Sequence, residues 1–485
     1  MGFFTRIFGK HKNESGNRPP RVFFTNTLSG EKELFISQKP RIATMYSCGP
    51  TVYSRAHIGN LRAYVFSVTL SRVLGGAGYL VRRVINITDV GHLTSDSDEG
   101  VDKMAVGAAR EHKTPEEIAD RYTKLFLEDL IELNINTEDI SFPRATGYIK
   151  EQIALAKTLE EKGFAYRLPN GLYFDTQKFH GYGKLGGLSR ADREAGARVD
   201  VVKGKNNPND FVLWRIAGAN DLQQWDSPWG RGNPGWHIEC SAMARALLGQ
   251  EIDIHTGGED LSQIHHNNEI AQSEAANGRT FVHYWMHSAF LTMNGEKASK
   301  STGNAIYLSD IIEKGFHPLS LRYSFLQAHY RTPLSFSWDA LAGAESALER
   351  LWKISRDVAS ESGRLSASGE ARDRFLASVR DDLATPQALS ILWDSLRSEE
   401  YAPREKWGLL EDADAHFGLS LINPPEANSL KEADIPEEIG EMLARRSAAR
   451  ASKDFKEADR IRGEIEKSGY HVDDGPNGSV LTKRS

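Results

Sequence analysis

The sequence contains only two cysteines, Cys48 and Cys240, among its 485 residues. Two cysteines cannot form a disulfide framework, and in a cytoplasmic protein they usually remain thiols used for packing, metal binding or chemistry. No apolar run approaches the length of a membrane span. The first twenty residues lack the long apolar core of a secretory signal. We therefore expect a cytoplasmic protein that makes no membrane contact.

An excess of positive charge is also absent, because 60 lysines and arginines are outnumbered by 66 acidic residues, which gives a net charge of −6. This balance argues against a protein that coats nucleic acid indiscriminately, although it allows a local basic face. Apolar residues make up 40% of the chain and charged residues 26%, which is typical of a globular enzyme. The length predicts two to four domains of roughly 100 to 200 residues each.

Residues 41–140 alternate short apolar runs with a helical pattern. "RIATMYSC" (41–48) predicts a buried strand, "RAYVFSVTLSRVL" (62–74) a helix, "GGAG" (75–78) a turn and "YLVRRVINITD" (79–89) a second strand. A strand, a crossover helix and a strand predict a parallel sheet. Because the glycines follow the helix instead of opening it, they indicate a helix stop and not a dinucleotide fingerprint.

The remainder of the chain changes character several times. Residues 142–227 are polar and irregular, which predicts an insertion carrying hairpins, and "EIDIHTGGED" (251–260) predicts a strand that resumes the sheet before a helix from about His265. Beyond Ser337 apolar residues recur at spacings of three and four, which predicts helices. The segment "INPPEANSLKEADIPEE" (422–438) predicts a linker before a last small unit.

Possible metal ligands surround the second cysteine. Cys240 lies in "PGWHIECSAM". The segment "IHHNNEIAQSE" contains His265, which is 25 residues after Cys240, and Glu269. On a helix, His265 and Glu269 are one turn apart on the same face. Two sulfurs, an imidazole and a carboxylate are a plausible ligand set for zinc. The alternative at this point is two buried thiols and a solvated His/Glu pair.

Two further segments indicate phosphate chemistry. "EKASKSTGN" (296–304) places Lys297 and Lys300 among small hydroxyl residues, which predicts a cationic loop able to close over a polyphosphate. "HIGN" (57–60) lies where a turn after a strand opens a helix, so its amides and imidazole face anions. Each signal is weak alone, because a tetrapeptide recurs by chance and lysine pairs are common on surfaces. Their order along the chain makes them specific.

With these segments the chain resembles the class I aminoacyl-tRNA synthetases, and among them the cysteinyl-tRNA synthetases. The resemblance extends from about Val22 to the C-terminus and is carried by seven ordered segments, "YSCGPTVYSRAHIGN", "NDFVLWR", "GWHIECSAM", "HHNNEIAQSE", "KASKSTGN", "HYRTPLSFS" and "DDLATPQA". It implies an α/β fold, in which a Rossmann-like parallel-sheet catalytic domain is split by a connective insertion. A helical bundle that binds tRNA and a small mixed C-terminal unit that binds the anticodon would follow.

The resemblance also implies domain boundaries, which we state as expectations. A flexible N-terminal extension would cover 1–21. The two catalytic halves would cover 22–140 and 229–285, with the insertion at 141–228 between them. The lysine loop and stem-contact region would cover 286–342, the helical tRNA-binding domain 343–425 and the anticodon-binding unit 426–485.

The resemblance implies the reaction and its site residues. L-cysteine would be activated by ATP, accompanied by Mg²⁺, and the cysteinyl group would then pass from the adenylate to tRNA(Cys), with the protein acting as a monomer. One zinc ion per chain would be bound by Cys48, Cys240, His265 and Glu269, and it would select the cysteine thiol over the serine hydroxyl. Thr88 and Trp236 would contact the amino acid. The residues implied to act on ATP are Gly49, His57, Gly59, Asn60, Gly257, Gly258, Asp260, Lys297 and Lys300, of which His57, Asn60, Lys297 and Lys300 would be catalytic.

Some positions depart from the family pattern. Asn60 replaces the more usual second histidine, which predicts reduced pH sensitivity because an amide carries no charge. Ala298 replaces a methionine between the two lysines and removes a packing group. Leu481 occupies the place of a tryptophan that would stack on the anticodon, a contact worth about 1 to 3 kcal/mol per base. Anticodon reading is therefore the least secure part of the resemblance.

Two alternative functions remain at this point. A related ligase joins activated cysteine to an amino sugar with the same zinc and adenylation elements, but the long helical and terminal sequence beyond Ser337 has no purpose there. A paralogue that only binds cysteine or tRNA would be favoured had a lysine or a zinc ligand been lost. Pyrophosphate exchange, which needs no tRNA, separates an adenylating enzyme from a binding protein.

Overall fold

The architecture is that of a computed structural model, which describes residues 19–90, 102–185, 204–218, 221–293, 296–297, 305–425, 435–452, 454–475 and 478–483. The predictions for Ala298 and Lys300, and those for most of the N-terminal extension, lie outside these residues. So does the middle of the predicted linker. Among the described helices, none is long and apolar enough to cross a membrane.

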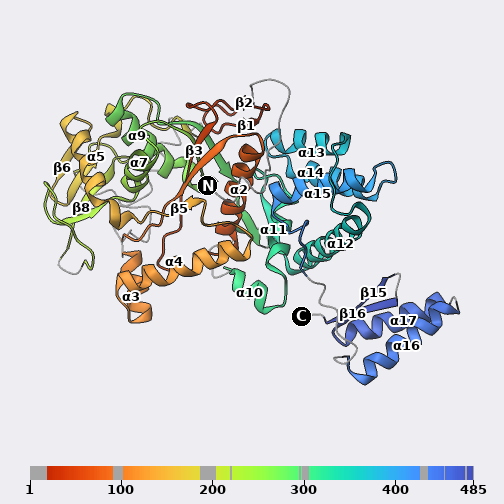
Figure 1. Ribbon diagram of the computed structural model, residues 1–485. Helices are drawn as coiled ribbons and strands as arrows, with labels where there is room; N and C mark the ends of the chain where they lie inside the picture. Colours follow the sequence, from red (N-terminus) through yellow and green to blue (C-terminus); the bar gives the residue numbers. More distant parts are fainter. Residues whose placement is uncertain are drawn as a thin grey trace.

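A five-stranded parallel sheet forms the centre of the molecule (Figure 1), and its strand order is β11-β10-β3-β4-β5. Every neighbouring pair in it is parallel. Parallel strands require crossover connections, which bring the chain back to the same end of the sheet before each new strand. The predicted strand, helix and parallel strand are therefore confirmed. The strand bounds are Ile42–Ser47 for β3, Leu80–Ile85 for β4, Ile140–Ser141 for β5, Ile252–Gly258 for β10 and Val282–Ser288 for β11.

The crossover helix α2 (Ile58–Gly76) is buried along most of its length. It contacts the sheet through β4, β10 and β11 and the helical bundle through α15, so it has no wide polar face. The prediction of a turn over "GGAG" is wrong for Gly75 and Gly76, which belong to the last turn of α2. Gly78 does leave the helix, with a φ of +89° that favours glycine.

The region predicted as an irregular insertion is more ordered than its composition indicates. Its hairpins are confirmed as an antiparallel sheet of order β6-β7-β8-β9, with bounds Ala165–Leu168, Gly171–Phe174, Phe211–Ile216 and Gly232–Pro234. The prediction missed helix α5 (Ile149–Glu161), which packs against α7 (Trp236–Leu247) and α9 (His265–Asn277). Its buried apolar residues recur at helical spacing, and the surrounding polar residues obscured them.

Other short elements complete the part of the chain before the helical bundle. Two helices precede the insertion, α3 (Lys103–Glu111) and α4 (Pro115–Glu132), and α8 (Glu259–Gln263) follows β10. The N-terminal hairpin pairs β1 (Phe23–Thr25) with β2 (Lys32–Leu34). A small sheet of order β13-β12-β14 contains Glu296–Lys297, Leu291–Met293 and Leu334–Phe336. Helices α10 (Leu308–Glu313) and α11 (Pro318–Leu326) lie in sequence between β13 and β14.

The region beyond Ser337 is helical, as predicted. Helices α12 to α15 have the bounds Trp338–Ser362, Glu370–Arg380, Thr385–Arg397 and Pro403–Phe417. One hydrophobic core includes residues from this bundle together with residues from α2 and the central sheet, such as Phe66, Ile254, Leu348 and Phe417. The bundle is therefore packed onto α2 and the central sheet through a shared core.

The C-terminal unit contains α16 (Glu437–Ala451), α17 (Phe455–Lys467) and the hairpin of β15 (Tyr470–Gly475) and β16 (Gly478–Lys483). Figure 1 shows it as a lobe separate from the bundle. Its own small core includes Ile461, Ile465 and Leu481. Leu481 is 2% exposed. Its side chain therefore supports the fold of this unit and does not reach the surface, where a nucleotide base could stack on it.

Candidate active site and metal centre

The predicted metal ligands come from three elements that meet at one edge of the central sheet. Cys48 directly follows β3, Cys240 lies on α7, and both His265 and Glu269 lie on α9. The carboxyl ends of parallel strands share one edge of a sheet, which is where ligands bind in folds of this kind. The helix predicted from His265 is confirmed, and it places His265 and Glu269 one turn apart on the same face.

The side chains of these four residues converge within the described part of the chain. The two sulfurs are 4.0 Å apart, Cys48 Sγ lies 3.9 Å from Glu269 Oε1, and His265 Nε2 lies 3.1 Å from the same oxygen. One ligand atom from each residue lies within 4.8 Å of every other. Zinc bonds of 2.0 to 2.3 Å require ligand atoms about 3.3 to 3.8 Å apart in a tetrahedron. The four groups thus fit one ion after small movements.

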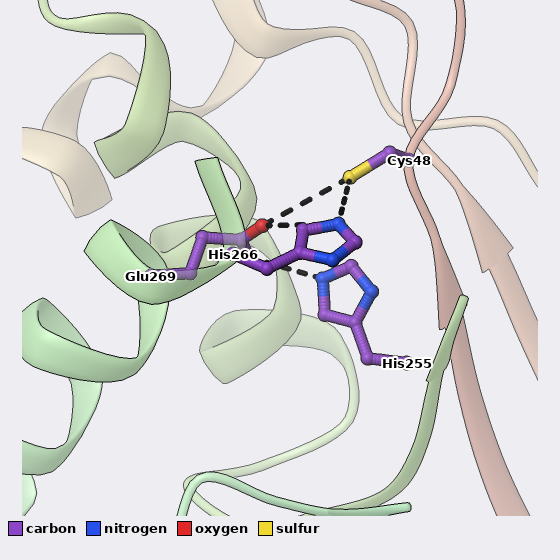
Figure 2. Close-up of side chains that lie close together, drawn as sticks. All are labelled: Cys48, His255, His266 and Glu269. Atoms are coloured by element: carbon purple, nitrogen blue, oxygen red, sulfur yellow. Dashed lines mark hydrogen bonds and ion pairs between the residues drawn. The ribbon is translucent and has the colours of Figure 1, made fainter. Parts of the chain in front are cut away.

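A second set of possible ligands overlaps the first, and Figure 2 shows its members, Cys48, His255, His266 and Glu269. His266 Nε2 lies 3.3 Å from Cys48 Sγ, and His255 Nε2 lies 3.1 Å from Glu269 Oε2. The Glu269 carboxylate therefore divides its oxygens, with Oε1 facing His265 and Oε2 facing His255. The sequence analysis missed both additional histidines, although "IHHNNE" and "DIHTGG" contain them next to predicted site residues.

A chain of histidines lies behind the candidate ligands. His237 Nδ1 is 2.9 Å from His265 Nδ1, so the Nε2 atom of His265 is the one that faces Glu269. His266 Nδ1 is 2.7 Å from His287 Nε2, and His287 Nδ1 is 2.8 Å from the hydroxyl of Thr27. Partners of this kind behind a metal ligand fix the orientation and tautomer of its ring.

The electrostatics of the cluster favour a bound cation. A hydrogen bond from Cys48 lowers the pKa of the Cys240 thiol to about 7, whereas burial raises the pKa of Cys48 well above its usual range. Burial disfavours the His265 imidazolium, but the Glu269 carboxylate and the Cys240 thiol together outweigh burial and raise the pKa of His265 to about 10. Burial also acts against ionised Glu269, yet His255 and His265 lower its pKa to about 2. Without an ion, a proton on His265 and a proton on the Cys48 thiol limit the net negative charge of the cluster.

The two residues predicted to contact the amino acid lie beside this cluster. The Trp236 ring is 4.4 Å from that of His265, and α7 places it one turn before Cys240, as predicted for a helix. Thr88 is buried, and its Oγ1 lies 3.3 Å from Glu239 Oε2. Glu239 is fully buried, and burial raises its pKa well above the usual range. Its position one residue before Cys240 was the only sequence signal for it.

Asn86 connects several groups of the site and was missed from the sequence. Its Oδ1 accepts a hydrogen bond of 2.8 Å from the Gly49 amide, and its Nδ2 donates one of 3.0 Å to Thr88 Oγ1. A Cβ at position 49 would lie 1.4 Å from the carbonyl oxygen of Asn86. Glycine is therefore required at position 49 by the close approach of two backbone segments.

The predicted ATP-binding residues at the start of α2 hold each other in place. His57 is the N-cap of α2, its Nδ1 accepts from the Asn60 amide at 3.3 Å, and the Asn60 Oδ1 accepts from the His57 amide at 3.2 Å. Gly59 lies between them in the first turn of α2. A helix start of this kind directs amides outward toward an anion. Asn60 thus has a capping role besides any contact with ATP.

The segment predicted to hold the adenosine ends β10. A Cβ at Gly257 would lie 2.8 Å from His266 Cε1, and one at Gly258 would lie 2.5 Å from Asp260 Oδ1. The glycine at 257 is thus explained by the packing of His266, and its contact with adenine stays a prediction. Asp260 lies exposed on α8, and the neighbouring Glu259 accepts a 2.7 Å hydrogen bond from the Phe290 amide.

Only the backbone of Lys297 is described, in β13, where it pairs with Thr292 of β12. The role of both lysines stays a prediction.

Comparisons with known proteins agree with this site. Residues 35–346 match the family described as tRNA synthetases class I (C) catalytic domain, and residues 432–479 match the cysteinyl-tRNA ligase anticodon binding domain. A protein named "Cysteine--tRNA ligase 1" from Burkholderia lata is 47% identical over 90% of this chain and 92% of its own. One named "Cysteine--tRNA ligase" from Treponema denticola is 42% identical over 93% of this chain and 97% of its own.

Solved structures show the same fold at low sequence identity. Mycobacterium tuberculosis methionyl-tRNA synthetase in complex with methionyl-adenylate has a TM-score of 0.55 at 16% identity, covering 80% of this chain and 92% of that one. A leucyl enzyme, the Agrobacterium radiobacter K84 agnB2 LeuRS-tRNA-LeuAMS complex, has a TM-score of 0.57 at 11% identity, covering 81% and 87%. Together with the family matches and the extent of identity to curated relatives, the parallel sheet and its thiol, histidine and carboxylate cluster lead to one conclusion: the chain belongs to the cysteinyl-tRNA synthetase family of class I aminoacyl-tRNA synthetases.

Proposed function

We propose that this chain ligates L-cysteine to tRNA(Cys) through a cysteinyl adenylate, and that it selects cysteine with a zinc ion held by Cys48, Cys240, His265 and Glu269. The observation that carries the proposal is the convergence of these four groups in a member of this family. Two thiols with one imidazole and one carboxylate favour zinc over the harder cations, which prefer oxygen ligands.

The selectivity follows from the chemistry of the donor set. Bound zinc would supply a soft Lewis-acidic centre that takes the deprotonated thiol of cysteine far better than the hydroxyl of serine. A contact that the competitor cannot make gives about 10⁴-fold discrimination, whereas a pocket that judges only size gives about 10- to 200-fold. Trp236 would form an aromatic wall of this pocket and Thr88 would orient the substrate, with Glu239 and Asn86 holding Thr88 in place.

The chain's own residues would carry the first chemical step on the nucleotide side. The cysteine carboxylate attacks the α-phosphorus of ATP, the bond to the bridging oxygen breaks, and pyrophosphate leaves with that electron pair. Such a step depends on positioning and charge neutralisation more than on a protein nucleophile. His57 and Asn60, fixed by their mutual cap at the start of α2, would contact the phosphates, and Lys297 and Lys300 would stabilise the departing pyrophosphate together with Mg²⁺.

The remaining predicted contacts hold the adenosine. Asp260 would accept a hydrogen bond from the ribose, and the backbone at Gly49, Gly59, Gly257 and Gly258 would lie against the nucleotide. In the second step a hydroxyl of the terminal ribose of tRNA attacks the carbonyl carbon of the cysteinyl group, and AMP leaves. The C-terminal unit would read the anticodon, the helical bundle would bind the tRNA, and a single chain would suffice. A protein that charges tRNA for translation would act in the cytoplasm.

The test is cysteine-dependent exchange of pyrophosphate into ATP by the purified chain, with serine as the competing substrate and zinc measured in the same preparation. We expect exchange with cysteine, none with serine at the same concentration, and about one zinc per chain. Absence of exchange in a folded, zinc-loaded sample would contradict the adenylation proposal. Equal exchange with serine would contradict the selection by metal.

A second assay separates the possible acceptors. After the adenylate has formed, tRNA(Cys) and an amino sugar are offered in parallel, and the cysteinyl product is measured. The match to an anticodon-binding domain favours tRNA. Transfer only to the amino sugar would instead support the alternative ligase, and transfer to neither would support a paralogue that binds without completing the reaction.

A further inference from the structure

The family segments "HYRTPLSFS" and "DDLATPQA" meet at a single side chain, Asp382. Asp382 lies in the turn between α13 and α14 of the helical bundle and is 8% exposed. Its Oδ1 accepts hydrogen bonds of 2.8 Å from the Tyr330 hydroxyl and of 2.8 Å from the Thr25 amide. Its Oδ2 accepts one of 2.5 Å from Thr25 Oγ1. The carboxylate therefore joins the bundle to two separate segments of the catalytic half.

The backbone of Asp382 makes two more contacts with the same segments. Its amide donates to the Phe23 carbonyl at 2.9 Å, and its carbonyl lies 2.7 Å from His329 Nε2. His329 Nε2 and Arg331 Nη1 each lie 3.8 Å from Asp382 Oδ2. A buried carboxylate that accepts this many hydrogen bonds is fixed in position, and it fixes the positions of its donors Thr25 and Tyr330.

The turn that makes these contacts has an unusual backbone conformation. Asp382 has a φ of +55° and the next residue, Leu383, has one of +53°. Aspartate tolerates this left-handed region, but leucine rarely adopts it. Two such residues in succession persist only where the surroundings impose them, and strain of this kind gathers at functional sites.

The segment held by Asp382 leads to the strands that contain Lys297. Arg62 of α2 donates to the Ala289 and Phe290 carbonyls at 2.8 and 2.7 Å, and to the Thr332 carbonyl at 2.5 Å. The Ala289 amide donates to the Tyr330 carbonyl at 2.8 Å. Residues 329–332 and 289–290 are thus bound together immediately before β14 and β12, which pair with each other.

These directional bonds lie beside a small gap in the packing, about large enough for one water molecule. A cavity beside the junction is lined by Arg62, Phe66, Ser288, Leu383 and Thr385, among others. The Tyr330 ring stacks on Phe66 of α2 with centroids 4.4 Å apart, but a cavity leaves neighbouring groups room to shift. Hydrogen bonds to Asp382, together with those from Arg62 and the Ala289 amide, and not shape alone, would then fix where residues 329–332 lie.

We propose that Asp382 is a positioning residue for adenylation, which holds residues 329–332 and, through Arg62, the paired strands β12 and β13 that place Lys297. Asp382 acts through these strands and touches no substrate. This inference rests on the function proposed above, because it requires that Lys297 act on the pyrophosphate group. Small displacements of a group that acts in the transition state lower kcat while leaving ground-state binding of cysteine unchanged.

The test compares Asp382→Asn with Asp381→Asn in the intact, zinc-loaded chain. Asparagine keeps the shape of the side chain and tolerates positive φ. It removes the negative charge that faces His329 and Arg331, and its amino group in place of Oδ2 can only donate to Thr25 Oγ1, which reverses that hydrogen bond. Asp381 is a matched control, because its side chain is 53% exposed and pairs at the surface with Lys32. Pyrophosphate exchange is measured with ATP, pyrophosphate and cysteine, and active sites are counted from the burst of adenylate.

We expect Asp382→Asn to lower kcat per active site about tenfold with an unchanged KM for cysteine, and Asp381→Asn to stay within about twofold of the unaltered chain. Tyr330→Phe, which removes one donor and keeps the stacked ring, should lower kcat by a smaller factor in the same direction. This second variant keeps the test decisive if Asp382→Asn folds poorly.

The contrary outcomes are distinct. If Asp382→Asn and Tyr330→Phe lower the melting temperature or the number of active sites while kcat per active site is unchanged, Asp382 is merely structural and the inference is overturned. If the unaltered, zinc-loaded chain performs no exchange at all, the proposed function is overturned and the inference with it. Equal zinc content in every variant confirms that the metal site is not the cause.

Discussion

The two sides of the proposed active site are built in different ways. The proposed amino-acid side consists of Cys48, Cys240, His265 and Glu269, and apart from half-buried Cys48 its members are at most 2% exposed. His237 orients the His265 ring from behind, and His287 does the same for His266 of the overlapping ligand set. The proposed nucleotide side consists of His57, Asn60, Asp260 and Lys297. Its described side chains are half-buried or exposed, and His57 and Asn60 are fixed mainly by the helix cap between them.

The difference in burial matches what each proposed side would have to recognise, which is cysteine on one side and ATP on the other. Cysteine and serine differ in one atom, so discrimination requires desolvated groups whose positions are fixed in advance. ATP offers a large anionic surface, which exposed amides and cations can bind without close shape selection. We therefore expect substitutions on the buried side to have large effects on metal content and stability, and those on the exposed side to change rates modestly.

The largest effect should come from the buried ligands, where Cys240→Ser and His255→Gln separate the two overlapping ligand sets. Removal of a residue that only supports a metal ligand weakens binding by up to about 100-fold. Loss of a true ligand should therefore weaken zinc binding by more than that. We expect that loss for Cys240→Ser and a smaller one for His255→Gln. Competition with a chelator measures the affinity. The reverse order would assign the metal to His255 and His266.

A steric change at the boundary between the two sides should be nearly as severe. Gly49→Ala would place a Cβ 1.4 Å from the Asn86 carbonyl oxygen, so we expect a loss of about 3 kcal/mol in the free energy of unfolding, at the upper end for overpacking. Gly343→Ala on α12 is the control, because no atom lies within 4 Å of its added Cβ and alanine favours a helix by about 1 kcal/mol. Equal stability of the two variants in urea unfolding would contradict this account.

The buried side should also make the metal-free chain sensitive to pH. The pKa of His265 is raised to about 10 and that of Glu269 is lowered to about 2. Because the histidine pKa is raised, its contribution to stability is complete below about pH 6.5 and is lost as pH rises through about 10. The depressed carboxylate contributes above its unfolded value and loses that contribution as pH falls through about 2. Melting temperatures of the chelator-treated chain should therefore decline toward alkaline pH.

Metal binding should show the opposite trend with pH, since the ion displaces protons from His265 and the thiols. Apparent zinc affinity should rise about tenfold per pH unit for each proton released. An affinity independent of pH between 6 and 8 would show that the ligands are already deprotonated in the metal-free chain.

The smallest effect is expected on the exposed side. Asn60→His adds a group that gains charge below about pH 6.5, or lower still because it lies at the start of a helix. Exchange should acquire a pH dependence there and change by less than about fivefold, since exposed charges contribute about 1 kcal/mol or less. A tenfold or larger change would mean that the nucleotide side is as tightly fixed as the metal side.

Local periodicity allowed much of this site to be predicted. The crossover unit, the helix from His265, the helical region beyond Ser337 and the pairing of His265 with Glu269 across one turn all depend on residues close in sequence. The same reasoning failed for α5, whose apolar stripe is interrupted by polar residues, and for Gly75 and Gly76, which a helix end tolerates. It also gave no sign that Leu481 is buried in the core of the C-terminal unit.

The sequence by itself determined the kinds of groups present and the family to which the chain belongs. Only the tertiary structure decided that Cys48 and Cys240 approach to 4.0 Å, that His255 and His266 share the cluster, and that Asp382 joins the bundle to residues 329–332. The physical reason is range. Helix and strand periods relate residues a few positions apart, whereas contacts between residues from 14 positions apart, as for His255 and Glu269, to 357, as for Thr25 and Asp382, follow from strand order, crossover connections and side-chain packing.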